Sequence, residues 1–218
     1  MLPLPCIQKY KEEKMENKTA NQQPIMLYTE QTPNPESLKF VTNRMNYKGT
    51  ADFKSEELAK EWSALATALF EKPFVKGVYI CNNFVTVTKE LNYSWDDIMM
   101  DLKSFIKEYL EAGKEVVKEG YQDAIAEIEM EQSDIEYSAE DKQIVIKIKE
   151  LINTYVRPAV EMDGGNIEFK SFDNGVVSVI LQGSCSGCPS ASVTLKSGIE
   201  GMLKRMVPQV TEVVSEMG

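Results

Sequence analysis

The sequence feature that most constrains this chain is a short stretch, Gly183–Ser190, which carries two cysteines three positions apart. The apolar run 176–181 before it predicts a buried strand. Pro189 predicts the first position of a helix, because the N–H that proline lacks is not needed there. We therefore expect a strand-to-helix turn with Cys188 near the helix N-cap. Free N–H groups at a helix start favour the thiolate, which is the form that binds soft metals or attacks disulfides.

The composition restricts what this pair of thiols can do. The 218 residues include four cysteines and no histidine, which removes Cys-His hydrolase chemistry and any histidine-ligated zinc or Rieske-type site. A formal net charge of −10 argues against nucleic acid or an anionic membrane as a partner, and no apolar run is long enough to span a bilayer. Residues 1–24 are interpreted as a disordered tail without the apolar core of a secretory signal. We therefore expect a cytoplasmic location, with an organellar one as the alternative.

Residues 25–112 are interpreted as a first domain with the element order ββαββα. Turn signals at Thr32–Pro35 and at Asn82-Asn83 each separate two strand-like runs, which predicts two hairpins. A single helix is expected after the capping residue Ser55, because apolar residues then repeat at helical spacing. A later S-x-x-D pattern predicts the second helix.

Residues 113–137 are expected to form an acidic linker. Acidic side chains far outnumber basic ones there and apolar residues are sparse, so a partly helical, self-repelling connection is favoured over a packed element. Residues 138–218 then form a second domain in the order αββαβ, with a helix capped by Ser138 and a hairpin turn at Asp173–Gly175. The fold class is thus α+β, with two small α/β-type domains joined by the linker.

Cys185 and Cys188 supply two ligands, whereas a closed tetrahedral zinc site or an iron–sulfur cluster normally takes four. Cys6 lies in the tail, and Cys81, in the first domain, has the character of a small buried hydrophobe. The simplest route to four thiolates is a two-fold dimer in which each protomer gives its pair. Metal or cluster binding, dithiol redox chemistry and accidental spacing stay open on the residues alone. The redox hypothesis lacks a full βαβ pattern of thioredoxin type around the motif, because a β-hairpin precedes it.

Several motifs at consistent spacing resemble the C-terminal domain of NifU, the Nfu domain, over roughly residues 140–215. They are Val156–Val160, Asp163–Ile167, Leu181–Ser190, Thr194–Lys196 and Gly198–Glu200. The first domain is similar to the N-terminal domain of many Nfu proteins through Thr32–Pro35 and Ser37–Phe40. Together the two resemblances cover most of the chain outside the tail and the linker.

The resemblance implies an iron–sulfur cluster scaffold or carrier, with no catalytic residues. Family members hold a labile [4Fe–4S] cluster between two protomers, so Cys185 and Cys188 are the implied ligands of a homodimer that forms on cluster binding, with [2Fe–2S] as the alternative cluster. The implied partners are apo iron–sulfur recipient proteins and an upstream cluster-assembly scaffold. Two rival hypotheses stand beside this one: a thiol–disulfide oxidoreductase that uses the same dithiol, and a zinc-bridged structural dimer.

Overall fold

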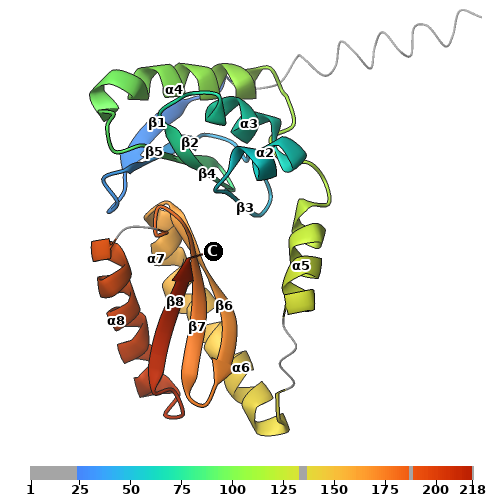
Figure 1. Ribbon diagram of the computed structural model, residues 1–218, viewed down its shortest axis with the longest axis vertical. Coiled ribbons are helices and arrows are strands. Elements are labelled where there is room, and N and C mark those ends of the chain that lie inside the picture. Colours follow the sequence, from blue (N-terminus) through green and yellow to red (C-terminus); the bar gives the residue numbers. More distant parts are fainter. Residues whose placement is uncertain (1–23, 133–136, 187–188, 218) are drawn as a thin grey trace, which may run out of the picture.

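The computed structural model describes residues 24–132, 137–186 and 189–217. These residues form two α+β domains, each with its own sheet (Figure 1). The tail predicted over residues 1–24 lies, apart from its last residue, outside the described residues. In the described part of the chain, no helix has both the length and the apolar character that a membrane span requires.

The N-terminal sheet has five strands in the order β1-β2-β5-β4-β3, and every neighbouring pair is antiparallel. The strands are β1 (Leu27–Gln31), β2 (Ser37–Thr42), β3 (Thr50–Phe53), β4 (Val75–Cys81) and β5 (Phe84–Lys89). Both predicted hairpins are confirmed, and Asn82 supplies the positive φ of 45° that the β4–β5 turn requires. The predicted order ββαββα misses β3, because its four residues, Thr50–Phe53, are too short an alternating run to be told from a loop.

Helices cover one face of this sheet (Figure 1): α2 (Glu56–Trp62), α3 (Ala64–Phe70) and α4 (Trp95–Glu111). The single helix expected after Ser55 is in fact two helices, because Ser63 interrupts it. The Ser63 N–H donates to the Ala59 carbonyl at 2.7 Å and ends α2. The Ser63 hydroxyl accepts from the Ala66 N–H at 3.0 Å and starts α3.

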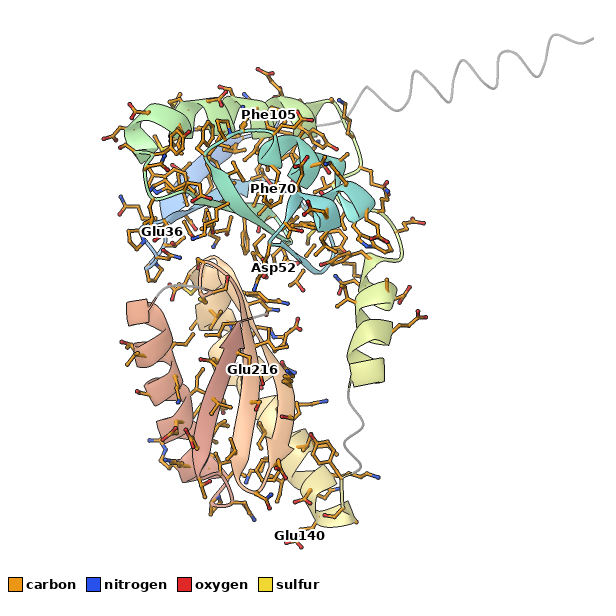
Figure 2. All side chains as sticks on the ribbon, in the orientation of Figure 1. Glu36, Asp52, Phe70, Phe105, Glu140 and Glu216 are labelled. Atoms are coloured by element: carbon orange, nitrogen blue, oxygen red, sulfur yellow. The ribbon has the colours of Figure 1, made fainter. Side chains whose placement is uncertain are left out.

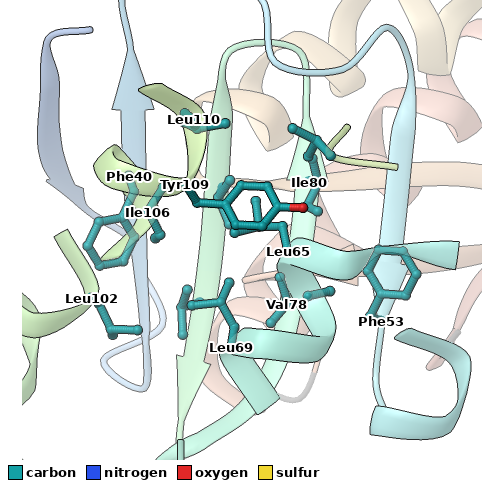
Figure 3. Close-up of a cluster of buried hydrophobic side chains, with 14 of the residues drawn as sticks. Phe40, Phe53, Leu65, Leu69, Val78, Ile80, Leu102, Ile106, Tyr109 and Leu110 are labelled. Carbon is teal, nitrogen blue, oxygen red and sulfur yellow. The ribbon is translucent and has the colours of Figure 1, made fainter. Parts of the chain in front are cut away.

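Successive side chains of a strand point to opposite faces of the sheet, and in the N-terminal sheet both faces are buried. The face under the helices forms the main core, in which Phe40 and Ile80 pack with Leu65 and Leu102 (Figure 3). The opposite face carries a separate buried cluster, here called the lower-face cluster: Val41, Tyr79, Cys81 and Phe84. The C-terminal domain lies on that side of the sheet (Figure 1), so both faces are covered.

The acidic segment is only in part the unpacked linker that its composition predicts. Val116, Val117 and Tyr121 are buried in the N-terminal core. The Tyr121 ring centroid lies 5.6 Å from that of Phe53 and 5.7 Å from that of Trp62. Helix α5 (Tyr121–Gln132) begins at this contact. The expectation of an unpacked segment is therefore wrong for its first part, because three apolar side chains are enough to anchor it to the domain.

Replacing Tyr121 by alanine tests this anchoring. We expect Tyr121→Ala to lower the free energy of unfolding of the N-terminal domain by about 3 kcal/mol, because it empties a buried aromatic site. Asp123→Ala, two residues later on the exposed side of α5, is the control and should change it by less than about 0.5 kcal/mol. Urea unfolding followed by tryptophan fluorescence, which reports Trp62 and Trp95 of this domain, measures both. Equal unfolding midpoints in the two variants would show that the segment is not packed.

The C-terminal domain confirms the predicted order αββαβ. Its elements are α6 (Ala139–Leu151), a π-helical turn η1 (Ile152–Val156), α7 (Arg157–Met162), β6 (Gly165–Asp173), β7 (Val176–Gly183), α8 (Pro189–Met206) and β8 (Glu212–Met217). The predicted cap is present, since the Ser138 hydroxyl accepts from the Asp141 N–H at 3.1 Å. The first helix runs through α6, η1 and α7, and the π-helical turn ends just before Pro158, which has no N–H for a regular helical bond.

The C-terminal sheet has the order β6-β7-β8, with β6 antiparallel and β8 parallel to β7. Helix α8 makes the crossover between the two parallel strands. The elements β7, α8 and β8 therefore form a βαβ unit around the cysteine stretch. The predicted order αββαβ contains this strand–helix–strand succession, and the predicted hairpin precedes it, since β6 pairs antiparallel with β7.

Candidate functional site

The cysteine stretch lies between β7 and α8, as the sequence predicts. Strand β7 ends at Gly183 and helix α8 begins at Pro189. Cys185 lies in the connection, whereas Cys188 and Cys6 lie outside the described residues. The structure thus places one of the two predicted ligands. Among the residues that it describes, no three acidic, cysteine or histidine side chains gather into a complete metal site.

Cys185 is enclosed by its own domain on one side. Its side chain is 6% exposed and belongs to the C-terminal core. Its sulfur lies 3.8 Å from the Ser184 hydroxyl oxygen. Gly165, at the start of β6, gives the sulfur room, because a Cβ there would lie 2.9 Å from Sγ and 2.6 Å from the Gln182 carbonyl oxygen. Position 165 therefore accepts no side chain while Cys185 keeps this place.

Hydrogen bonds to backbone carbonyls fix the turn around Cys185. The Ser186 N–H and hydroxyl both donate to the Gly183 carbonyl, at 3.1 and 2.9 Å. The Ser184 N–H donates to the Gly164 carbonyl at 3.3 Å, and its hydroxyl donates to the Asp163 carbonyl. Gly183 has a φ of 63°, in the left-handed region that side chains disfavour. The turn is therefore tied to the loop between α7 and β6.

The Cys185 side chain lines a pocket of about 400 Å³ between the two domains. The pocket is lined by Pro33, Asn34, Asp163, Ser184, Cys185, Thr194 and Leu195. Burial raises the pKa of Asp163 above its usual value, which the nearby Lys39 ammonium opposes. Cys185 is thus one of the residues that line an open space whose walls come from both domains.

Asn34 of the N-terminal domain binds the cysteine turn directly. Its side-chain Nδ2 donates to the Ser184 carbonyl at 3.1 Å, in a buried position. Its Oδ1 accepts from the Glu36 N–H at 3.0 Å, which holds the amide in place. In the sequence, Thr32–Pro35 indicated a turn and a family resemblance, and neither assigned Asn34 a contact. No local pattern joins two residues 150 positions apart, so sequence reasoning missed this contact.

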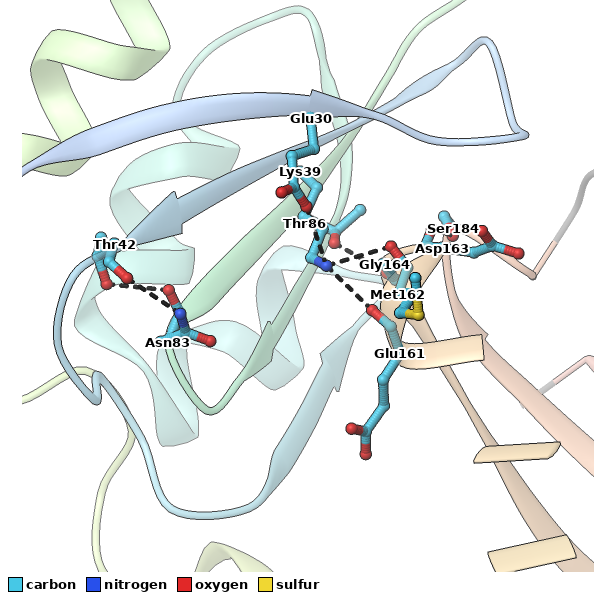
Figure 4. Close-up of polar contacts among 10 residues, drawn as sticks. All are labelled: Glu30, Lys39, Thr42, Asn83, Thr86, Glu161, Met162, Asp163, Gly164 and Ser184. Atoms are coloured by element: carbon cyan, nitrogen blue, oxygen red, sulfur yellow. Dashed lines mark hydrogen bonds and ion pairs between the residues drawn. The ribbon is translucent and has the colours of Figure 1, made fainter. Parts of the chain in front are cut away.

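Two further side chains of the N-terminal sheet bind backbone carbonyls of the C-terminal domain (Figure 4). Lys39 Nζ donates to the carbonyls of Glu161 at 3.1 Å and Met162 at 3.2 Å. These carbonyls lie at the end of helix α7, where no further helical N–H follows. The Glu161 carbonyl also accepts from the Gly164 N–H at 3.0 Å. Thr86 Oγ1 donates to the Gly164 carbonyl at 2.8 Å. The loop that supports the cysteine turn is thereby bonded to both β2 and β5.

A carboxyl group also lies at the domain boundary. Asp52, on β3, points toward the C-terminal domain (Figure 2). Burial raises its pKa to about 6, whereas the Lys54 ammonium and a backbone hydrogen bond from Gly183 act in the opposite direction. Its side chain lines a second pocket, of about 330 Å³, together with Tyr79 and Ser186. The backbone of the cysteine turn therefore contacts a partly buried acid of the other domain.

Cys81 is a buried residue, as predicted. Its side chain is 1% exposed and belongs to the lower-face cluster. Burial raises the pKa of its thiol, which favours the uncharged form. Cys81 and Cys185 are both buried thiols in the structure.

Two family models match this chain, one in each domain. The NifU-like domain matches residues 148–214, and the model described as scaffold protein Nfu/NifU N terminal matches residues 27–113. The two matches lie on either side of the acidic segment. Each includes one side of the contact between Asn34 and Ser184.

Curated relatives carry the name NFU1 iron-sulfur cluster scaffold homolog, mitochondrial. The Drosophila willistoni protein is 38% identical over 191 residues, which are 87% of this chain and 63% of that protein. The Drosophila virilis protein is 37% identical over 87% of this chain and 61% of its own length. The chain thus spans less than two thirds of these relatives. A solution NMR structure of a NifU-like protein from Saccharomyces cerevisiae aligns with a TM-score of 0.41 and 27% identity, over 46% of this chain and 91% of that one.

Proposed function

This chain belongs to the Nfu/NifU family, and from that premise we propose that it is an iron–sulfur cluster scaffold and carrier rather than an enzyme. The observation that carries the proposal is the position of Cys185, whose side chain lines a pocket at a strand-to-helix turn. Cys188 follows three positions later in the sequence. Thiolate sulfur is the donor by which proteins hold iron–sulfur clusters, so the residues present fit this cargo.

The proposed ligands are Cys185 and Cys188, in a cluster-binding domain of residues 138–218. Residues 25–112 form the other domain, and residues 113–137 connect the two. A [4Fe–4S] cluster takes four thiolates and one chain offers two, so two protomers share one cluster as a homodimer. A [2Fe–2S] cluster takes the same number of thiolates, so the iron content, and not the ligand count, distinguishes the two forms.

Delivery proceeds by exchange of thiolates. The free N–H groups at the start of α8 stabilise negative charge on the sulfurs of the turn. A recipient thiol loses its proton and binds iron in place of one thiolate of the carrier, and the released thiolate takes up a proton. Each exchange breaks one iron–sulfur bond and forms one, with no change in oxidation state. Such a site is shared between chains and dissociates easily, which suits a carrier.

The partners of a carrier follow from this chemistry. Apo iron–sulfur proteins with free cysteines receive the cluster, and an upstream assembly scaffold supplies it. The curated relatives are named as mitochondrial, so the mitochondrion is the alternative to the cytoplasmic location that the sequence predicts. Neither nucleic acid nor a membrane is a proposed partner, because the net charge is −10.

Anaerobic reconstitution of the full chain with iron and sulfide tests the proposal. Visible absorption, iron and sulfide content, and mass from size-exclusion chromatography are measured on the same sample. We expect a brown dimer with about four irons per two chains. About two irons per two chains would identify [2Fe–2S] instead. A parallel sample reconstituted with zinc and no iron shows whether the dimer requires the cluster.

Two results would contradict the proposal. A colourless monomer that reduces disulfides catalytically would favour the oxidoreductase, in which Cys185 attacks and Cys188 resolves. A protein that takes no cluster and forms a stable dimer with about half a zinc per chain would favour the structural zinc site.

A further inference from the structure

We infer that the N-terminal domain is a removable cover for the cysteine turn: its lower sheet face and the Thr32–Pro35 turn hold residues 183–186, and this contact opens before two protomers meet there. The contact between the two domains is itself seen in the hydrogen bonds and close approaches of this chain. Its role in controlling cluster loading rests on the proposed function. The occupant of the lower sheet face is therefore this chain's own cysteine turn.

The first support is a set of hydrogen bonds that three side chains of the N-terminal domain donate across the contact. Asn34, Lys39 and Thr86 of the N-terminal domain donate to backbone carbonyls of the C-terminal domain. Lys39 is 7% exposed and also pairs with Glu30 at 3.2 Å, so its ammonium has three partners when the domains are docked. Separation of the two domains removes both carbonyl partners of Lys39 and leaves its ion pair with Glu30. Contact between the domains therefore gives these side-chain donors protein acceptors, whereas in the separated N-terminal domain they would face water.

The second support is the close approach of two glycines to N-terminal side chains. A Cβ at Gly183 would lie 2.9 Å from the Tyr79 ring. A Cβ at Gly164 would lie 3.0 Å from Thr86 Oγ1 and 3.3 Å from the Thr32 methyl carbon. The backbone of the C-terminal domain thus lies directly against the sheet at both positions. Only glycine permits this approach, so the fit is specific and not a loose contact between neighbours.

The third support is the apolar character of the covered face. Tyr79 and Cys81 are each 1% exposed on the lower face of the sheet, away from the main core. Charged groups that act on the Cys81 thiol include Glu161 and Arg157 of the C-terminal domain. Cys81 therefore faces that domain, and undocking exposes it to solvent. Cys81 and Cys185 lie on opposite sides of the same contact.

The cysteine turn cannot contact the N-terminal domain and the cysteine turn of a second protomer at the same time. Four thiolates of one cluster converge on a few ångströms, so the two cysteine turns meet face to face. In the docked chain Pro33 and Asn34 form part of the pocket that Cys185 lines, and Asn34 binds the adjoining carbonyl. Contacts between domains of one chain resemble transient interfaces, for which relative motion is the normal expectation. The connecting segment retains both domains while the contact opens.

The test uses thiol alkylation of the full-length apo chain by iodoacetamide, with the modified cysteines identified by peptide mass. The double variant Lys39→Met/Thr86→Val removes two of the three donors, leaves Asn34 in place and keeps side chains of similar volume. Loss of these hydrogen bonds shifts the docking equilibrium toward the open form about tenfold or more. We expect the alkylation rates of Cys185 and Cys81 to rise together by that factor.

Thr88→Val is the matched control. Thr88 lies two residues after Thr86 on β5, and its hydroxyl bonds to the Ser37 hydroxyl at 2.8 Å within the N-terminal domain. We expect wild-type alkylation rates for this variant. Unfolding in urea, followed by tryptophan fluorescence, shows whether either variant loosens the domain itself. A double variant with a wild-type unfolding midpoint and faster alkylation of both cysteines supports the cover.

Wild-type alkylation rates of Cys185 and Cys81 in the double variant would overturn the cover, whatever the protein does with iron. Anaerobic reconstitution of the same variant tests the consequence, and we expect faster appearance of the brown dimer than in the wild type. Faster alkylation with no brown dimer from any variant would overturn the proposed function and leave the cover standing. Faster alkylation with an unchanged loading rate would overturn its role in loading.

Discussion

Cys185→Ala and Cys188→Ala, made singly, are each expected to abolish both the brown colour and the dimer. Each substitution removes one thiolate per protomer, so two of the four ligands of a shared cluster disappear at once. Iron bound after anaerobic reconstitution should fall from about four per two chains to background. Size-exclusion chromatography should then give the mass of a monomer. This is the largest effect that we predict for any single side chain.

Two other cysteines provide the controls. Cys6→Ser is expected to leave iron content and dimer unchanged. Cys81→Ala removes a buried side chain and should cost some stability while the reconstituted protein keeps its iron. Iron retained by Cys185→Ala would place the ligands elsewhere in the chain. An equal mixture of Cys185→Ala and Cys188→Ala chains should stay colourless, because any pairing of the two offers only two thiolates.

Gly183→Ala is expected to lower the free energy of unfolding by about 2–4 kcal/mol. The φ of 63° costs a side chain roughly 1 kcal/mol. The new Cβ would also lie 2.7 Å from the Gly164 carbonyl oxygen and 2.9 Å from the Tyr79 ring. Relief of such contacts requires backbone movement, which typically costs about 1–3 kcal/mol. Urea unfolding followed by circular dichroism measures the change.

Gly198→Ala is the matched control for Gly183→Ala. Gly198 lies within α8, and a Cβ there would have nothing within 4 Å. Alanine is a better helix former than glycine by about 1 kcal/mol, so this substitution should stabilise the chain. Equal unfolding midpoints for the two alanine variants would show that position 183 tolerates a side chain. The close approach of the turn to the N-terminal sheet would then be wrong.

Local chemistry made much of the fold predictable. Asn82 adopts the positive φ that its turn predicts, and Ser138 caps the helix that its spacing predicts. Helix α8 begins at Pro189, as the missing N–H of proline indicates. These signals act within a few residues, so they appear in the sequence as recognisable patterns.

Other elements depended on partners far away in the chain. Strand β3 is four residues long and pairs with β4 across more than twenty residues. Tyr121 looked like part of a solvated linker and instead packs on Phe53 and Trp62. The local sequence of each is too short or too sparse in apolar residues to distinguish packing from exposure, because the surface that buries it is made elsewhere.

The candidate site divides in the same way. The sequence by itself determined the two cysteines, their spacing, the turn between strand and helix, and the resemblance of both domains to a family. Only the tertiary structure decided that Asn34, Lys39 and Thr86 bind the loops around Cys185. Residues within one turn interact through bonds that the order of the chain dictates. Residues 78 to 150 positions apart meet only after both domains have folded, and no local pattern records the meeting.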